Sequence, residues 1–172
     1  MLRIPHVCQA YTWTCGPACL AAVLYYWGAF DGSETELYEA CGTTEQGTTP
    51  QGLVACAQEY GAGAVLRTDM LLSELRNAVA CGITCILLVQ AWAETPTDYR
   101  TSDVDGHYVV LCDITEHGLI VMDPSIPARY GTIPLDDFLR RWHDNDNGAQ
   151  YVRAAILVNS EAPAEHWPLP VG

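Results

Sequence analysis

A cysteine, a histidine and an aspartate stand at separate points of the chain where they could act together as nucleophile, base and orienting acid. Cys15 opens an apolar segment of helical spacing and is followed by Gly16 and Pro17. A sulfur at the start of a helix lies in the positive end of the helix dipole, which favours the thiolate form. Cys15 is therefore a candidate nucleophile, although seven other cysteines compete for that role and it can equally be an apolar packing residue.

His107 starts a predicted strand beside Gly106, a residue that lets a substrate backbone approach, and Asp123 ends the next strand. A turn between the two strands predicts an antiparallel hairpin, which brings His107 and Asp123 to the same end. The carboxylate would then accept from one imidazole nitrogen and direct the other at the sulfur. Taken singly, the histidine is also typical of a turn or core residue, and Asp-Pro is a common turn signal.

Gln9 lies six residues before the candidate nucleophile Cys15. Its side-chain amide could donate to an oxyanion together with the backbone N–H of Cys15. A solvent-facing glutamine is the alternative. Each of these four residues falls where its role requires, so the set is more informative than any member.

The elements that must position these residues divide into a helix-rich first half and a strand-rich second half. The predicted helices occupy residues 15–28, 33–42, 49–61, 71–81 and 135–142. The predicted strands occupy residues 64–68, 83–92, 107–115, 119–123 and 151–158. This order predicts an α+β domain over residues 1–159, with the helical half packed on a mostly antiparallel sheet. Residues 160–172 form a proline-containing tail, and residues 93–104 a polar loop expected to border the substrate cleft.

The composition excludes several classes of protein. A net charge of −13 with only eight Lys and Arg argues against nucleic-acid binding, which needs clustered cations. The acidic balance reflects either solubility or attraction for a basic substrate. No apolar run reaches the roughly 18–20 residues of a spanning helix, and the N-terminus lacks a secretory-signal pattern. We therefore expect no membrane insertion and a cytoplasmic location; the oligomeric state is left open.

The cysteines and histidines do not form a disulfide or metal framework. There is no CxxC pair, and His6, His117 and His166 share no ligand spacing with other residues. Residues 142–148 lack the spacing of a calcium loop and are expected to form a solvated turn. We expect no cofactor, no metal and mostly reduced, buried thiols, because most cysteines fall in predicted helices or strands: Cys19, Cys41, Cys56, Cys81, Cys85 and Cys112.

Three segments resemble the double-glycine, bacteriocin-processing cysteine peptidase family of the papain-like superfamily. They are Gln9 with residues 15–20, residues 105–110 around His107, and residues 122–125 around Asp123. The resemblance spans residues 4–158 and has the same order of Gln, Cys, His and Asp. Thr14 stands where transporter-fused members commonly have Asp, and the chain shows no transporter region, so it resembles a stand-alone relative.

The resemblance implies a papain-like fold and cleavage of a leader peptide after a pair of small residues. It also implies a catalytic set of Cys15, His107 and Asp123, with Gln9 in the oxyanion hole. The expected partner is therefore a peptide or protein substrate. Two other functions stay open: an acyl or amide transferase that uses the same acyl-enzyme, and a catalytically silent module that binds peptides.

Overall fold

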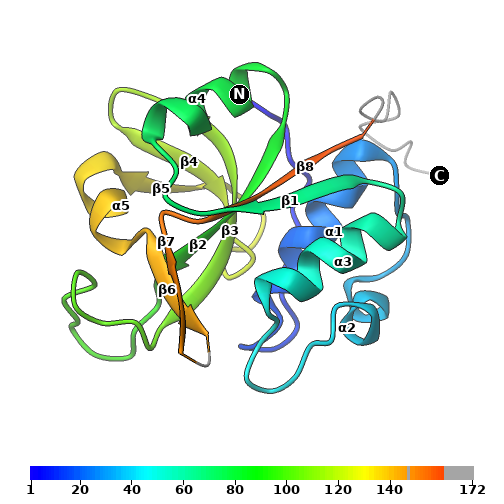
Figure 1. The fold of residues 1–172 in the computed structure, drawn as a ribbon, viewed down its shortest axis with the longest axis horizontal. Coiled ribbons are helices and arrows are strands. Elements are labelled where there is room, and N and C mark those ends of the chain that lie inside the picture. Colours follow the sequence, from blue (N-terminus) through cyan, green and yellow to red (C-terminus); the bar gives the residue numbers. More distant parts are fainter. Residues whose placement is uncertain (147, 161–172) are drawn as a thin grey trace.

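A six-stranded antiparallel sheet forms the centre of the molecule (Figure 1). The structure is a computed structural model, and it describes residues 1–146 and 148–160. The strands are ordered β1-β8-β2-β3-β4-β5 across the sheet, and each pairs antiparallel with its neighbours. Their bounds are β1 Gly63–Arg67, β2 Thr84–Gln90, β3 Gly106–Ile114, β4 Gly118–Met122, β5 Gly131–Pro134 and β8 Ala155–Asn159. Strands β6 (His143–Asp146) and β7 (Ala149–Val152) form a separate hairpin.

Helices cover both faces of the sheet, which confirms the α+β prediction. Figure 1 shows the N-terminal helices grouped to one side of the sheet and α5 at the other. Two apolar cores result, one shared by α1, α3 and the sheet and one shared by α4, α5 and the opposite face. The helix bounds are α1 Cys15–Trp27, the 3₁₀ helix η1 Glu34–Glu36, α2 Leu37–Ala40, α3 Pro50–Glu59, α4 Leu72–Ala80 and α5 Leu135–Arg141.

Helix α1 is buried almost all round because nearly every residue in it is apolar. It packs against β3, and its thiol at Cys19 donates to the backbone carbonyl of Tyr108 at 3.2 Å. The helix ends at Gly28, whose φ of 66° is a left-handed conformation that glycine adopts at little cost. Helix α1 is therefore held in place by packing on all sides, and its first residue, Cys15, lies beside the sheet.

Most predicted elements are confirmed, and four predictions need correction. The predicted helix 33–42 is split into η1 and α2, with Ser33 and Glu36 forming the expected capping box. Strand β5 was not predicted, because residues 131–134 are short and end in a proline. The predicted turn at 142–148 contains β6. The predicted strand 151–158 is confirmed in part: it is divided into the end of β7 and most of β8, because Arg153 has a φ of 48° and separates them.

Six of the eight cysteines are buried and all eight are free thiols; Cys8 and Cys81 are exposed. Within residues 1–146 and 148–160, no helix has the length and apolar character needed to cross a membrane. The predicted tail lies, apart from Ser160, outside the described residues, so the boundary near residue 159 stays a prediction.

Candidate active site

Cys15 is the first residue of α1 and is 7% exposed. The preceding turn is fixed by Thr14, whose hydroxyl accepts from the Tyr11 backbone N–H at 3.1 Å and whose own N–H donates to the Tyr11 carbonyl at 3.1 Å. No side chain caps the first turn of the helix. The backbone N–H of Cys15 therefore remains available to an acceptor beside the sulfur, since first-turn N–H groups have no partner within the helix.

The structure brings His107 and Asp123 together with Cys15. The Nε2 atom of His107 lies 2.8 Å from Oδ1 of Asp123, and each residue is 6% exposed. Antiparallel pairing of β3 with β4 places the two residues at the same end of the hairpin, as predicted. The other ring nitrogen, Nδ1, is not used by Asp123, and Cys15 is near enough to the imidazole to contribute to raising its pKa.

The pair is polarised in the direction that nucleophilic catalysis requires. Burial alone lowers the pKa of His107, but hydrogen bonds and charge interactions with Asp123 and Cys15 outweigh it and raise the pKa to about 9. Burial likewise acts to raise the pKa of Asp123, but the hydrogen bond and charge of His107 lower it overall. At neutral pH the arrangement favours an imidazolium between a carboxylate and the sulfur.

Asp123 has two further donors, one of which the sequence analysis missed. Its Oδ1 accepts from the Ser125 backbone N–H at 2.8 Å, and its Oδ2 accepts from Nε1 of Trp92 at 3.1 Å. Trp92 has a φ of 63°, which is unusual for a bulky residue, and is 58% exposed. Its position directly after the apolar strand β2 was visible, but no spacing rule links it to Asp123. A cavity of about 420 Å³ is lined in part by the side chains of Trp92 and Asp123, and Cys15 is not among its lining residues.

Gln9 lies beside the turn that follows Asp123. Its backbone N–H donates to the Pro124 carbonyl at 3.1 Å, and its side-chain Oε1 accepts from the Ser125 hydroxyl at 3.1 Å. The amide Nε2 donates one hydrogen to the Tyr11 carbonyl at 3.0 Å. The second amide hydrogen has no hydrogen-bond partner among the described residues, and Gln9 is not part of the cleft lining that contains Cys15.

A cleft of about 530 Å³ contains Cys15 in its lining. One wall is the loop of residues 42–49, and the other is made by β6 together with Asp103, Val104 and Gly106. The loop 93–104 therefore reaches the cleft at its end, which confirms that prediction. Tyr108, also in the lining, donates its hydroxyl to the Thr48 carbonyl at 2.9 Å and so ties the sheet to the helical side.

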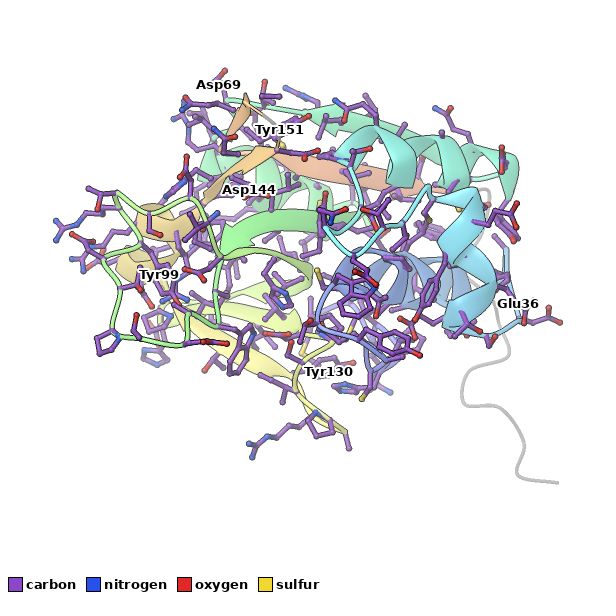
Figure 2. The ribbon with its side chains drawn as sticks, turned by 90° about the horizontal axis from the view of Figure 1, so that it is seen from below. Glu36, Asp69, Tyr99, Tyr130, Asp144 and Tyr151 are labelled. Carbon is purple, nitrogen blue, oxygen red and sulfur yellow. The ribbon has the colours of Figure 1, made fainter. Side chains whose placement is uncertain are left out.

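The hairpin β6–β7 forms part of the cleft and is tied to both halves of the molecule. Figure 2 labels Asp144 on β6 and Tyr151 on β7. The Tyr151 hydroxyl is hydrogen-bonded to the side chain of Gln51 on α3, at 3.0 and 3.2 Å. The carboxylate of Asp144 lies over Gly106, where an added Cβ would be 2.5 Å from Oδ1. The space that Gly106 leaves is thus occupied by Asp144 and not open to a substrate backbone, which corrects the prediction.

Comparison with known proteins gives the family. The model of the peptidase C39 family matches residues 3–145. The chain belongs to the peptidase C39 family. An uncharacterised protein of Methanothermobacter thermautotrophicus is 32% identical over 124 residues, which cover 70% of this chain and 71% of that protein.

Solved structures agree with the family assignment. The peptidase domain of Streptococcus ComA, a bifunctional ABC transporter of a quorum-sensing pathway, superposes with a TM-score of 0.67 at 25% identity, covering 90% of this chain and 97% of that one. A double-glycine-motif protease from an AMS/PCAT transporter, solved with its leader peptide, has a TM-score of 0.64 at 18% identity, covering 92% and 94%. This C39 chain therefore has the papain-like fold that the resemblance implied.

No group of three or more His, Cys, Asp or Glu side chains suited to a metal ion occurs within residues 1–146 and 148–160.

Proposed function

We propose that the protein is a cysteine peptidase that cleaves peptide bonds through Cys15. The observation that carries the proposal is a buried His107–Asp123 pair at 2.8 Å whose imidazole is influenced by Cys15, a residue that lines a cleft. Membership of the peptidase C39 family supports it. The reaction would begin when the thiolate attacks the substrate carbonyl carbon and forms a tetrahedral intermediate.

Each residue of the site has a role in that reaction. The backbone N–H of Cys15 and the second amide hydrogen of Gln9 would stabilise the oxyanion. His107 would transfer the Nδ1 proton to the leaving amine as the intermediate collapses to a thioester. It would then accept a proton from water, which attacks the thioester, releases the acid and restores the thiol–imidazole pair. Asp123 would keep the ring oriented throughout.

The structural neighbours suggest a leader peptide as the substrate class. One structural neighbour is a double-glycine-motif protease from an AMS/PCAT transporter, solved in complex with a leader peptide. We propose by analogy that this chain cleaves a leader-like segment after small residues. The eight free thiols support action in a reducing compartment such as the cytoplasm, because disulfides form mainly in oxidising compartments.

Selective alkylation tests the nucleophile. Limiting iodoacetamide is applied to the native protein from pH 5 to 9, and each modified cysteine is mapped by mass spectrometry. We expect Cys15 to react faster than the other seven below pH 7 in wild type and in His117→Ala, which removes an exposed histidine. His107→Ala should abolish that advantage. Equal labelling of Cys15 and its neighbours in wild type would reject the peptidase and leave the peptide-binding module.

Product analysis separates hydrolysis from acyl transfer. A synthetic peptide with an internal Gly-Gly pair is incubated with wild type and with Cys15→Ala, with and without an added amine or thiol. A free carboxylate in the wild-type product identifies a peptidase. An amide or thioester of the added nucleophile as the main product identifies a transferase that uses the same acyl-enzyme.

A further inference from the structure

The walls of the cleft beside Cys15 carry charge of one sign. Four acidic residues line it and no arginine does: Glu45, Asp103, Asp144 and Asp146. The cleft is a binding site for a reason independent of this charge, because the candidate nucleophile forms part of the same lining. A substrate whose carbonyl group acylates Cys15 must therefore lie beside these carboxylates.

Asp144 is the carboxylate most firmly held in this cleft. Its Oδ1 accepts from Nε2 of Gln90 at 2.9 Å, and Gln90 is itself fully buried. The same Gln90 amide accepts from the Asp105 backbone N–H at 2.9 Å through Oε1, so its orientation is fixed. The carboxylate also lies against Gly106, next to His107 in the chain. Asp144 is thus a fixed acceptor close to the reacting groups.

Asp144 forms no close ion pair with an arginine, histidine or terminal amine in the described part of the chain; the charge of neighbouring His143 acts to lower its pKa and that of Asp146 to raise it. Burial raises the pKa of Asp144 to about 6, so its ionisation is unfavourable in the folded protein. The ionised form of such a carboxylate is stabilised by a cation that a ligand supplies, because hydrogen bonds between charged groups are stronger than those between neutral groups.

We propose that the cleft selects a peptide with an arginine or lysine close to the cleaved bond and that Asp144 receives this basic side chain. Glu45 and Asp103, both exposed at the rim, add to the attraction. The inference rests on the proposed function, since it assumes that the ligand lying across Cys15 is a peptide. It gives the acidic residues of β6 a role in substrate selection, although they take no part in the proposed reaction.

The test measures binding, so that it does not depend on turnover. Cys15→Ala is titrated with fluorescent alanine–glycine peptides that carry one arginine, moved through each position on either side of a Gly-Gly pair. Matched peptides carry citrulline, which has the shape of arginine without its charge. We expect arginine to be preferred at one or more positions by about tenfold or more, the ratio typical of a hydrogen bond between charged groups.

Charge-removing variants locate the effect. Asp144→Asn, made in the Cys15→Ala protein, should reduce the arginine-to-citrulline ratio to about one to three. Asp103→Asn serves as a second cleft variant at an exposed position and should reduce the ratio by a smaller factor. Glu116→Gln removes one charge at the β3–β4 turn, the opposite end of the hairpin from His107, and should leave the ratio unchanged.

Three results would overturn the inference. The first is equal affinity for the arginine and citrulline peptides at every position, and the second is no binding of any arginine peptide at 1 mM, about the weakest affinity worth assigning to a specific site. The third is an equal decrease of the arginine-to-citrulline affinity ratio in Glu116→Gln and Asp144→Asn. None of these bears on cleavage, because wild-type alkylation and product analysis report that separately. A peptidase without arginine preference and a selective cleft without peptidase activity are therefore distinguishable.

Discussion

The indole N–H of Trp92 donates to Oδ2 of Asp123 at 3.1 Å, on the oxygen that His107 does not use. This contact and the Ser125 N–H hold the carboxylate in one orientation. Trp92 reaches Asp123 from a left-handed backbone conformation, which costs on the order of 1–3 kcal/mol for a residue other than glycine. Trp92 thus helps to orient the Asp123 carboxylate, and through it the His107 ring.

Trp92→Phe tests that role by removing the donor and keeping an aromatic ring. The Trp92 hydrogen bond lowers the pKa of Asp123, so its loss should raise that pKa. A carboxylate with a depressed pKa stabilises the fold at higher pH and loses its contribution as the pH falls through that value. We expect Trp92→Phe to lose about 1 kcal/mol near pH 7 and to start losing stability at a higher pH on acidification. Thermal unfolding from pH 3 to 7 measures both, with Trp13→Phe as the control; identical profiles would show the hydrogen bond to be unimportant.

The raised pKa of His107, about 9, predicts an alkaline limit. A histidine whose pKa rises on folding stabilises the protein fully below its unfolded pKa of about 6.5, and that contribution is lost as the pH rises through 9. We expect wild type to lose thermal stability between pH 6.5 and 9 and kcat/KM to fall near pH 9. Asp123→Asn should lower the His107 pKa and move both changes to lower pH, whereas His117→Gln should leave them in place. An activity that rises steadily past pH 10 would contradict this assignment.

Asp144→Asn should stabilise the protein at neutral pH. Because burial raises the pKa of Asp144 to about 6, folded protein holds the proton more tightly than unfolded protein, and stability falls as the pH rises from about 4 to 6. The substitution removes that loss, and the gain above pH 7 has an upper limit of about 3 kcal/mol. At pH 4 the variant and wild type should differ little. Urea unfolding at pH 4 and pH 8 measures the difference, and a variant that is less stable at pH 8 would contradict the argument.

The contact between Gly106 and Asp144 predicts coupled substitutions. An alanine at Gly106 would place Cβ 2.5 Å from the Asp144 carboxylate, and other near atoms belong to the same side chain. We expect Gly106→Ala to destabilise wild type by about 1–3 kcal/mol and to cost less in an Asp144→Ala background. Unfolding of the four proteins in the cycle gives the coupling energy. If the two substitutions are additive, the cost lies in the backbone and not in the contact.

Gln9→Ala tests the oxyanion role. Loss of one oxyanion donor typically lowers kcat by about 10²–10³-fold. Labelling of Cys15 by iodoacetamide forms no oxyanion and should be little changed. Ser125→Ala removes the hydroxyl that holds the Gln9 side chain at 3.1 Å and should give a smaller loss of kcat. If Gln9→Ala and wild type turn over equally, the oxyanion is stabilised by backbone groups alone.

The positions of the residues proposed to carry the chemistry were predictable because each stands at an element boundary that the sequence marks. Cys15 opens a wholly apolar helix, and His107 and Asp123 stand at one end of a hairpin whose turn is visible as Glu116-His117-Gly118. The surroundings of the site were not predictable. Trp92 reaches Asp123 through a left-handed backbone conformation that no local rule assigns to tryptophan. Asp144 lines the cleft from β6, a strand that the sequence pattern did not indicate because residues 142–148 favoured a turn.

The separation of Cys15 from His107 and Asp123 along the chain has a consequence for the newly made protein. Cys15 is synthesised before His107 and Asp123, which belong to a hairpin in a later part of the chain. At typical translation rates of about 5–20 residues per second, the thiol waits for several seconds before the sheet exists. During that interval Cys15 has neither the imidazole nor the cleft. Until β4 is complete, the newly made chain therefore cannot bring Cys15, His107 and Asp123 together.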